Sequence, residues 1–145
     1  MDAQNLDLAI RKRLERFQRT EKTEYLFYSW LAQRSAEGKN REVFARLSAD
    51  EKRHHDEWKR WTGVEVAPYT GRLLFFQWLT RLLGFTFVIK RMEALEDDTG
   101  DAYRALASVI PDIEQIAHDE DEHERALMEL LDEERLRYVG SIVLG

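Results

Sequence analysis

The chain has 145 residues, no cysteine and a formal net charge of −6 at pH 7. That length, with 43% hydrophobic residues, suits one domain with a single core. The missing cysteines exclude disulfides and metal sites built from thiolates. An acidic chain without a basic face is not expected to bind nucleic acid. Because residues 1–7 are polar and lack an apolar signal-peptide core, we expect the chain to lie on the cytoplasmic side.

Two long helices are predicted in the first half of the chain. The first runs from about Leu6 to Ser35 and stops near Gly38, since glycine tolerates the left-handed backbone of a helix end. The second is expected to be capped by Asn40 and to end near Gly63. The stretch from Gly63 to Gly71 is predicted to be a loop.

The next segment, Leu73 to Ile89, is apolar on nearly every side. One interpretation is a crossover helix that links two antiparallel helix pairs of a bundle. The other is an exposed apolar surface that pairs with a second copy or rests on a bilayer. Because symmetric pairing is the simplest way to cover such a patch, we expect a homodimer with Phe76 and Trp78 at or near the interface.

Two further helices are predicted in the second half. The third follows a helical spacing of core positions from Ile89 to Ile110. The fourth starts at Ile113, and Pro111 suits its beginning. The chain is therefore predicted to be all-α, with four bundle helices. Since residues after Tyr138 turn apolar, we expect a domain at 1–138 and the start of a truncated transmembrane region at 139–145.

In each predicted helix, two ionisable residues interrupt the core-facing positions near the middle. Two of these pairs are Glu-x-x-His, a spacing that places both side chains on one helix face. A buried carboxylate loses several kcal/mol of hydration, which a metal cation offsets. Solvated helix edges or buried salt bridges are the alternative, and eight positions in register on four helices disfavour it. The predicted ligands of a two-metal site are Glu21, Glu24, Glu51, His54, Glu93, Glu96, Glu120 and His123.

These motifs resemble the rubrerythrin type of the ferritin-like superfamily. That family has a Glu seven residues before a Tyr, as Glu21 and Tyr28 are here, two Glu-x-x-His motifs and one Glu-x-x-Glu. The resemblance implies a ferritin-like four-helix bundle with a crossover segment and two iron ions; manganese or zinc are alternatives. The extra carboxylate Glu24 departs from the pattern, so either it or Glu21 is the main ligand of the first helix. The four-cysteine iron module of rubrerythrins is absent.

Each predicted ligand has an expected role. The Glu of each Glu-x-x-His motif would bridge the metals, and each His would bind one of them. Glu21 and Glu93 would close the outer positions, while Glu24 and Glu96 would move in on oxidation. Tyr28 and Tyr103 are expected to donate hydrogen bonds to ligands.

Residues 133–145 resemble the junction before the first transmembrane helix of vacuolar-iron-transporter-type proteins that carry an N-terminal rubrerythrin-like domain. This resemblance implies an iron-binding or iron-oxidising domain, itself soluble, at the cytoplasmic face of a membrane iron or manganese transporter. The alternative is a stand-alone rubrerythrin-like peroxidase that reduces hydrogen peroxide. Metal ions, with O2 or hydrogen peroxide, are the expected small-molecule partners. The missing cysteine module and the apolar end favour the transporter domain.

Overall fold

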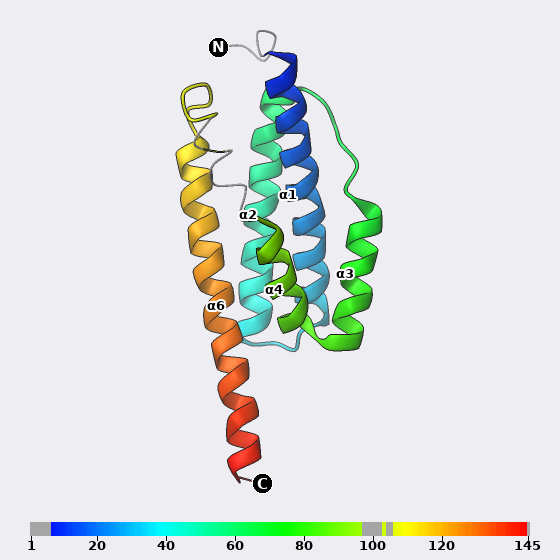
Figure 1. Cartoon of the computed structure of the whole chain (residues 1–145), viewed down its shortest axis with the longest axis vertical. Helices are drawn as coiled ribbons and strands as arrows, with labels where there is room; N and C mark the ends of the chain where they lie inside the picture. The colour runs from blue at the N-terminus through cyan, green and yellow to red at the C-terminus, as the bar shows by residue number, and fades with distance from the viewer. Residues whose placement is uncertain (1–6, 97–102, 104–105, 145) are drawn as a thin grey trace. The chain divides into compact units, whose positions relative to one another are not determined.

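The computed structural model describes residues 7–96, 103 and 106–144, with side chains described for 7–92, 103 and 106–132. It contains two compact units, one up to Leu82 and one from Leu83. All regular elements in the described ranges are helices, which confirms the all-α class (Figure 1). The four-helix bundle with a crossover and the domain end at residue 138 stay predictions. The helices are α1 (Leu8–Arg34), α2 (Lys39–Thr62), α3 (Thr70–Leu83), α4 (Phe85–Glu96) and α6 (Ile113–Leu144).

Helix α1 matches its predicted span to within two residues. It starts after Asp7, whose side chain accepts a hydrogen bond from the backbone N–H of Ala9 at 3.4 Å. It ends at Ser35, where the backbone N–H bonds to carbonyl oxygens of the last turn. Polar residues that bond to the free backbone groups at both ends explain why the helix begins and stops there.

The prediction that Asn40 caps α2 is wrong. Gly38 is the N-cap, with φ +141° and no side-chain hydrogen bond, and Asn40 lies inside the first turn. The tight connection from α1 needs a backbone conformation that glycine adopts without strain, so the helix starts directly after it. The predicted end of α2 is confirmed, because Gly63 takes the left-handed conformation with φ +68° and bonds to the carbonyl of Lys59.

Helices α1 and α2 form an antiparallel hairpin (Figure 1). Their facing residues recur at the three- and four-residue spacing of amphipathic helices, so one stripe of each helix is buried. Tyr28 stacks on Phe44 with ring centroids 6.4 Å apart. The buried apolar residues of the hairpin include Leu14, Phe27, Leu31, Phe44, Leu47 and Trp58.

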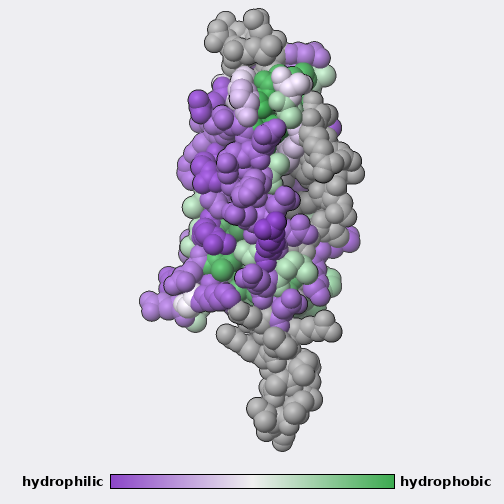
Figure 2. All heavy atoms as spheres, turned by 90° about the vertical axis from the view of Figure 1, so that its left-hand side faces the viewer, coloured by the Kyte–Doolittle hydropathy of each residue, from purple (hydrophilic) through white to green (hydrophobic). Residues whose placement is uncertain are grey.

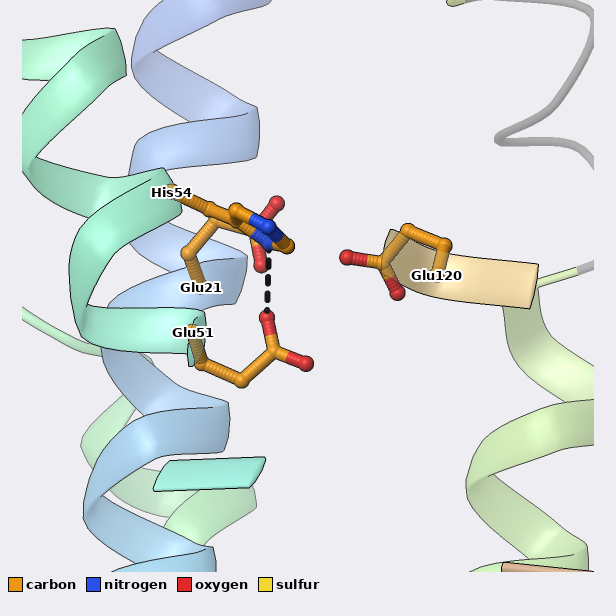
Figure 3. A group of neighbouring side chains, drawn as sticks. All are labelled: Glu21, Glu51, His54 and Glu120. Atoms are coloured by element: carbon orange, nitrogen blue, oxygen red, sulfur yellow. Dashed lines mark ion pairs between the residues drawn. The ribbon is translucent and has the colours of Figure 1, made fainter. Parts of the chain in front are cut away.

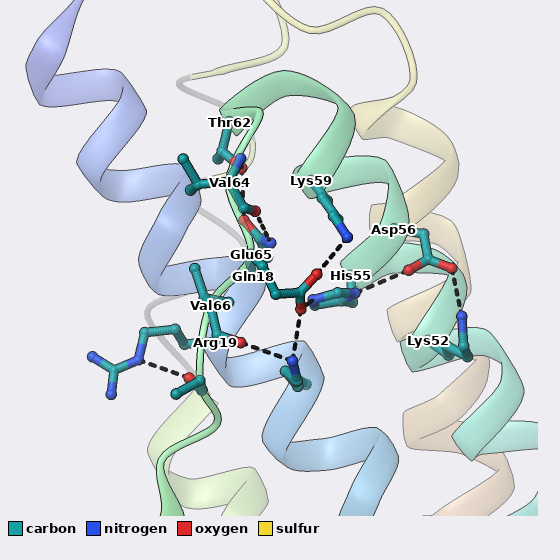
Figure 4. Close-up of polar contacts among 12 residues, drawn as sticks. Gln18, Arg19, Lys52, His55, Asp56, Lys59, Thr62, Val64, Glu65 and Val66 are labelled. Atoms are coloured by element: carbon teal, nitrogen blue, oxygen red, sulfur yellow. Dashed lines mark hydrogen bonds and ion pairs between the residues drawn. The ribbon is translucent and has the colours of Figure 1, made fainter.

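The connector between α2 and α3, residues 63–69, is held against α1 by side chains of α1 (Figure 4). Gln18 is fully buried; it accepts a hydrogen bond from the hydroxyl of Thr62 at 2.7 Å and donates one to the carbonyl of Val64 at 2.9 Å. Lys22 donates to the carbonyl of Val66 at 2.8 Å. Further along, Arg19 donates to the carbonyl of Ala67 at 3.1 Å, and Thr23 accepts from the N–H of Tyr69 at 2.9 Å. These bonds satisfy backbone groups that a loop would otherwise leave to water.

Glu65 forms ion pairs with a lysine from each helix of the hairpin (Figure 4). Its carboxylate lies 2.7 Å from Nζ of Lys22 and is also bonded to Lys59. Hydrogen bonds from Lys22 and Lys59 lower the pKa of Glu65 to about 2. The side chain of Glu65 thereby links the connector to both α1 and α2.

Helix α3 lies beside α1 and contacts it through Phe76 (Figure 1). The Phe76 side chain is 5% exposed, and its ring centroid is 5.9 Å from that of Phe27. Arg81 adds a cation–π contact at 5.6 Å from the ring centre of Trp30. The Leu73–Ile89 segment is not one helix, because Gly84 takes φ +83° and separates α3 from α4.

The second unit contains α4 and α6, which contact each other. Met92 on α4 and Leu130 on α6 are among its buried apolar residues. The third predicted helix departs from expectation near its end, because residues 107–109 form a turn with Ala107 exposed; Gly100 lies outside the described residues. Helix α6 runs unbroken past residue 138. Within the described parts of the chain, no helix is both long and apolar enough to cross a membrane.

Phe75 and Phe76 allow a matched test of the α3 packing. Phe76→Ala should lower the free energy of unfolding by about 3 kcal/mol, because it removes a buried ring. Phe75→Ala should cost about 0.5 kcal/mol or less, since that side chain is 51% exposed. Urea titrations followed by circular dichroism measure both. Equal losses in the two variants would contradict this packing of α3 on α1.

Glu65 gives a second prediction, on acid stability. Its folded pKa lies below the ordinary value of 4.5, so its contribution to stability is full above about pH 4.5 and is lost as the pH falls toward 2. The stability of Glu65→Gln should therefore depend less steeply on pH than that of the wild type in this window. Denaturant titrations at several pH values measure the slope. Glu37→Gln, an exposed change in the α1–α2 connection, should keep the wild-type slope; equal slopes for wild type and Glu65→Gln would contradict the prediction.

Candidate metal centre

Three predicted ligands meet inside the α1–α2 hairpin. Glu21 of α1 and Glu51 and His54 of α2 are 3%, 2% and 1% exposed. Each offers one ligand atom, and these atoms all lie within 4.8 Å of one another. Nδ1 of His54 is 3.4 Å from Oε2 of Glu51, and the three side chains point toward one another (Figure 3). The hairpin alone thus brings two carboxylates and an imidazole together.

The geometry follows from helix spacing. Glu51 and His54 are three residues apart, so they project from the same face of α2. That face also carries Leu47 and Trp58, which are fully buried, so the hydrophobic pattern turns the two polar side chains toward α1. Glu21 occupies the corresponding core-facing stripe of the antiparallel partner helix.

Trp58 is a member of this site that sequence reasoning missed. Its indole Nε1 donates a hydrogen bond to Oε1 of Glu21 at 3.3 Å, and both groups are buried. The ring also packs against Phe17, with centroids 5.8 Å apart. In the sequence Trp58 reads as an apolar core residue. Trp58 lies four residues after His54, however, and this spacing could have predicted that the indole is on the same face of α2 as Glu51 and His54.

The structure groups Glu21, and not Glu24, with Glu51 and His54. Glu24 is nevertheless buried, at 8% exposed, one turn further along α1. Tyr28, the expected hydrogen-bond donor, is buried as well. Among the described residues, Glu21 is therefore the α1 carboxylate that lies together with Glu51 and His54.

The neighbouring histidine, His55, has a different environment from His54. It is also buried, and its Nδ1 lies 3.0 Å from Oδ1 of Asp56 while Nε2 lies 3.7 Å from Oε1 of Glu65 (Figure 4). Burial raises the pKa of Asp56, but hydrogen bonds from Lys52 and His55 outweigh it and hold that pKa below its usual value. His55 thus belongs to the polar contacts of the connector rather than to the metal-ligand group.

The other predicted ligands lie in the second unit. On α6, His123 is buried and Glu120 is partly exposed, with Nδ1 of His123 3.9 Å from Oε2 of Glu120; Figure 3 also draws Glu120. Glu93 and Glu96 belong to α4, but their side chains lie outside the described part of the structure. Tyr103 is buried.

A second group of candidate ligand atoms on α6 was not predicted. It consists of His118, Asp119 and Glu122, which offer atoms within 4.8 Å of one another. Asp119 is buried and accepts a hydrogen bond from Gln115 at 3.0 Å, while the other two are exposed. Exposed acidic groups are common in proteins without a bound metal, so we do not count these three residues as candidate metal ligands.

The hairpin group fits a metal ion by its chemistry and its burial. Carboxylate oxygen and imidazole nitrogen are ligands of iron, manganese and zinc. Two carboxylates with almost no solvent contact are unusual unless a cation or strong hydrogen bonds compensate them. A buried Glu/His cluster of this kind can therefore hold a metal ion, while the number and identity of the ions are not fixed by it.

Comparison with known proteins returned no relative. No protein-family model matches the chain, and no curated protein or solved structure matches it either. The resemblance to rubrerythrin-type proteins therefore rests on the motifs and their spacing alone, and the family assignment stays a prediction.

Proposed function

We propose that this chain is an iron-binding domain that holds two metal ions in a site of carboxylates and histidines. One observation carries the proposal: Glu21, Glu51 and His54 place ligand atoms within 4.8 Å of one another in a buried part of the hairpin. The sequence repeats the Glu-x-x-His motif on α6, and a pair of such motifs suits a pair of metals.

Electrostatics supports a cation at the hairpin group. Removing an ionised carboxylate from water costs several kcal/mol, and two such groups close together also repel each other. Trp58 donates a neutral hydrogen bond to Glu21, which stabilises that buried carboxylate. A divalent ion bound between Glu21, Glu51 and His54 would neutralise both carboxylates.

In the complete site, we propose that Glu120 and His123 of α6 and Glu93 and Glu96 of α4 supply the remaining ligands. A second metal would then have its own histidine, as the first has His54. Iron, when bound, would supply the redox chemistry, changing oxidation state in a reaction with O2 or hydrogen peroxide. The protein's part would be to fix the ligands, and Trp58 would hold Glu21 in one orientation.

We further propose that the domain serves a membrane iron or manganese transporter, by binding or oxidising the ion. The resemblance of residues 133–145 to a transporter junction supports this role. A stand-alone peroxidase of the rubrerythrin type would need a source of electrons, and the chain has no cysteine for the usual iron–thiolate module.

Metal binding is tested best with the adjacent histidines. Protein prepared without metal should bind two equivalents of Fe²⁺ under anaerobic conditions, with a rise in melting temperature. His54→Gln should lose at least one equivalent, because it removes a ligand. His55→Gln should keep both, although its contacts to Asp56 and Glu65 are lost. Calorimetry and metal analysis measure the stoichiometry; equal binding by wild type and His54→Gln would refute the proposed site.

The role of Trp58 gives a separate prediction. Trp58→Phe keeps a ring beside Phe17 but removes the N–H that bonds to Glu21, so Fe²⁺ should bind about tenfold more weakly. Trp61→Phe, a matched change one turn away on α2, should leave the affinity unchanged. The measurement is again anaerobic calorimetry. An unchanged affinity in Trp58→Phe would show that the indole does not position Glu21 for the metal.

A further inference from the structure

Helix α3 has an exposed apolar face opposite the side that contacts α1. Its residues Leu74, Phe75, Trp78 and Leu82 are 59%, 51%, 57% and 62% exposed. At 100° per residue they fall within about 100° of the helix circumference. We call these four residues the α3 face.

The α3 face is rich in large aromatic surface. The rings of Phe75 and Trp78 stack on each other, with centroids 6.3 Å apart and planes 26° apart. Two stacked rings held at a protein surface form one continuous apolar patch. On the face that Figure 2 shows, by contrast, hydrophilic residues cover most of the coloured atoms.

Arginines lie at both ends of the α3 face. Arg72, near the start of α3, is over the ring of Tyr69 at 4.6 Å. Arg81, near its end, and Arg34 of α1 both make cation–π contacts with Trp30. Their guanidinium carbons lie 5.6 and 4.7 Å from the ring centroid. All three arginines are exposed residues, so cation–π contacts hold positive charge in water beside the apolar patch.

Charge in this stretch of the chain has one sign. Residues 66–92 contain Arg72, Arg81, Lys90 and Arg91 but no Asp or Glu, although the whole chain has 28 acidic and 22 basic residues. This segment is therefore cationic, although the protein as a whole is acidic. It lacks the Asp and Glu side chains that an anionic surface would repel.

We propose that the α3 face binds the surface of a bilayer that contains anionic lipids. Trp and Phe side chains favour the level of the lipid headgroups, and flanking arginines pair with their phosphates. A helix of 14 residues is too short to span the hydrocarbon core, so α3 lies parallel to the membrane with its apolar face inserted.

A second copy of the chain is the rival occupant, as the expected homodimer assumes. In a symmetric pair, however, the face of one copy meets the same face of the other. Arg72 and Arg81 would then approach the same arginines of the partner without any acidic residue of α3 to pair with them. Phe76 cannot contribute to such an interface, because it is buried against Phe27. Like charges across the interface therefore disfavour the dimer and favour an anionic surface.

Vesicle co-sedimentation of the full chain tests the proposal. The protein should bind phosphatidylcholine vesicles that contain phosphatidylglycerol, and bind pure phosphatidylcholine vesicles at least about tenfold more weakly. Phe75→Glu/Trp78→Glu should lose binding to both, because it removes the inserted rings. Arg72→Gln/Arg81→Gln should lower binding to the anionic vesicles about tenfold or more.

Two matched controls separate this face from general effects. Met128→Glu changes an exposed apolar residue of α6, and Arg41→Gln/Arg46→Gln changes exposed arginines of α2; both should bind vesicles as the wild type does. Circular dichroism verifies that every variant is folded. Equal binding to neutral and anionic vesicles would overturn the proposal. So would an absence of binding to the anionic vesicles. A dimer, detected by light scattering, that Phe75→Glu/Trp78→Glu converts to monomer would then assign the face to a second copy of the chain.

Discussion

Burial of acidic side chains between α1 and α2 is the constraint around which this hairpin is arranged. Glu21 and Glu51 face the interior where apolar residues would pack with less cost. A helix pair selected for stability alone has no reason to place them there, together with His54, at positions that the hydrophobic pattern forces inward. A group of this kind could hold a metal ion, whose positive charge would offset the cost of burying the carboxylates.

The polar groups of the hairpin are divided into two sets by the rotation of the helices. On α2, Glu51 and His54 face the interior, while His55 faces the connector. The first set brings ligand atoms close together, and the second set pairs with Asp56 and with Glu65 of the connector. His54 and His55 are adjacent in sequence, yet one helical step of about 100° separates their environments.

Much of the hairpin could be predicted from the sequence, because helix periodicity is a local property. The inward positions of Glu21, Glu51 and His54 follow from the apolar residues around them. What the sequence did not predict depends on contacts between distant segments, such as the bond from Trp58 to Glu21 or from Gln18 to the connector. Asn40 failed as a cap because the short turn at Gly38 decided where α2 starts.

The packing of the apolar segment after the connector also could not be predicted from the sequence. Its composition predicted a need for partners, but composition does not say which side of a helix meets the chain itself. Phe75 and Phe76 are neighbours with nearly equal hydrophobicity, and only the packing of α3 on α1 distinguishes them. Helix α3 then ends at Gly84, which has a positive φ. The pattern of apolar residues did not predict this end.

The connector also sets the length of chain between α2 and α3. Successive carbonyl groups at Val64, Val66 and Ala67 each accept a hydrogen bond from a different side chain of α1. An inserted or deleted residue would shift every carbonyl away from its donor and leave the buried amide of Gln18 without its partner. It would also change the rotation at which α3 begins, turning the stacked rings of Phe75 and Trp78 toward a different direction. This loop should therefore tolerate changes of side chain at Val64 or Ala67, whose backbones make the bonds, far better than any change in its length.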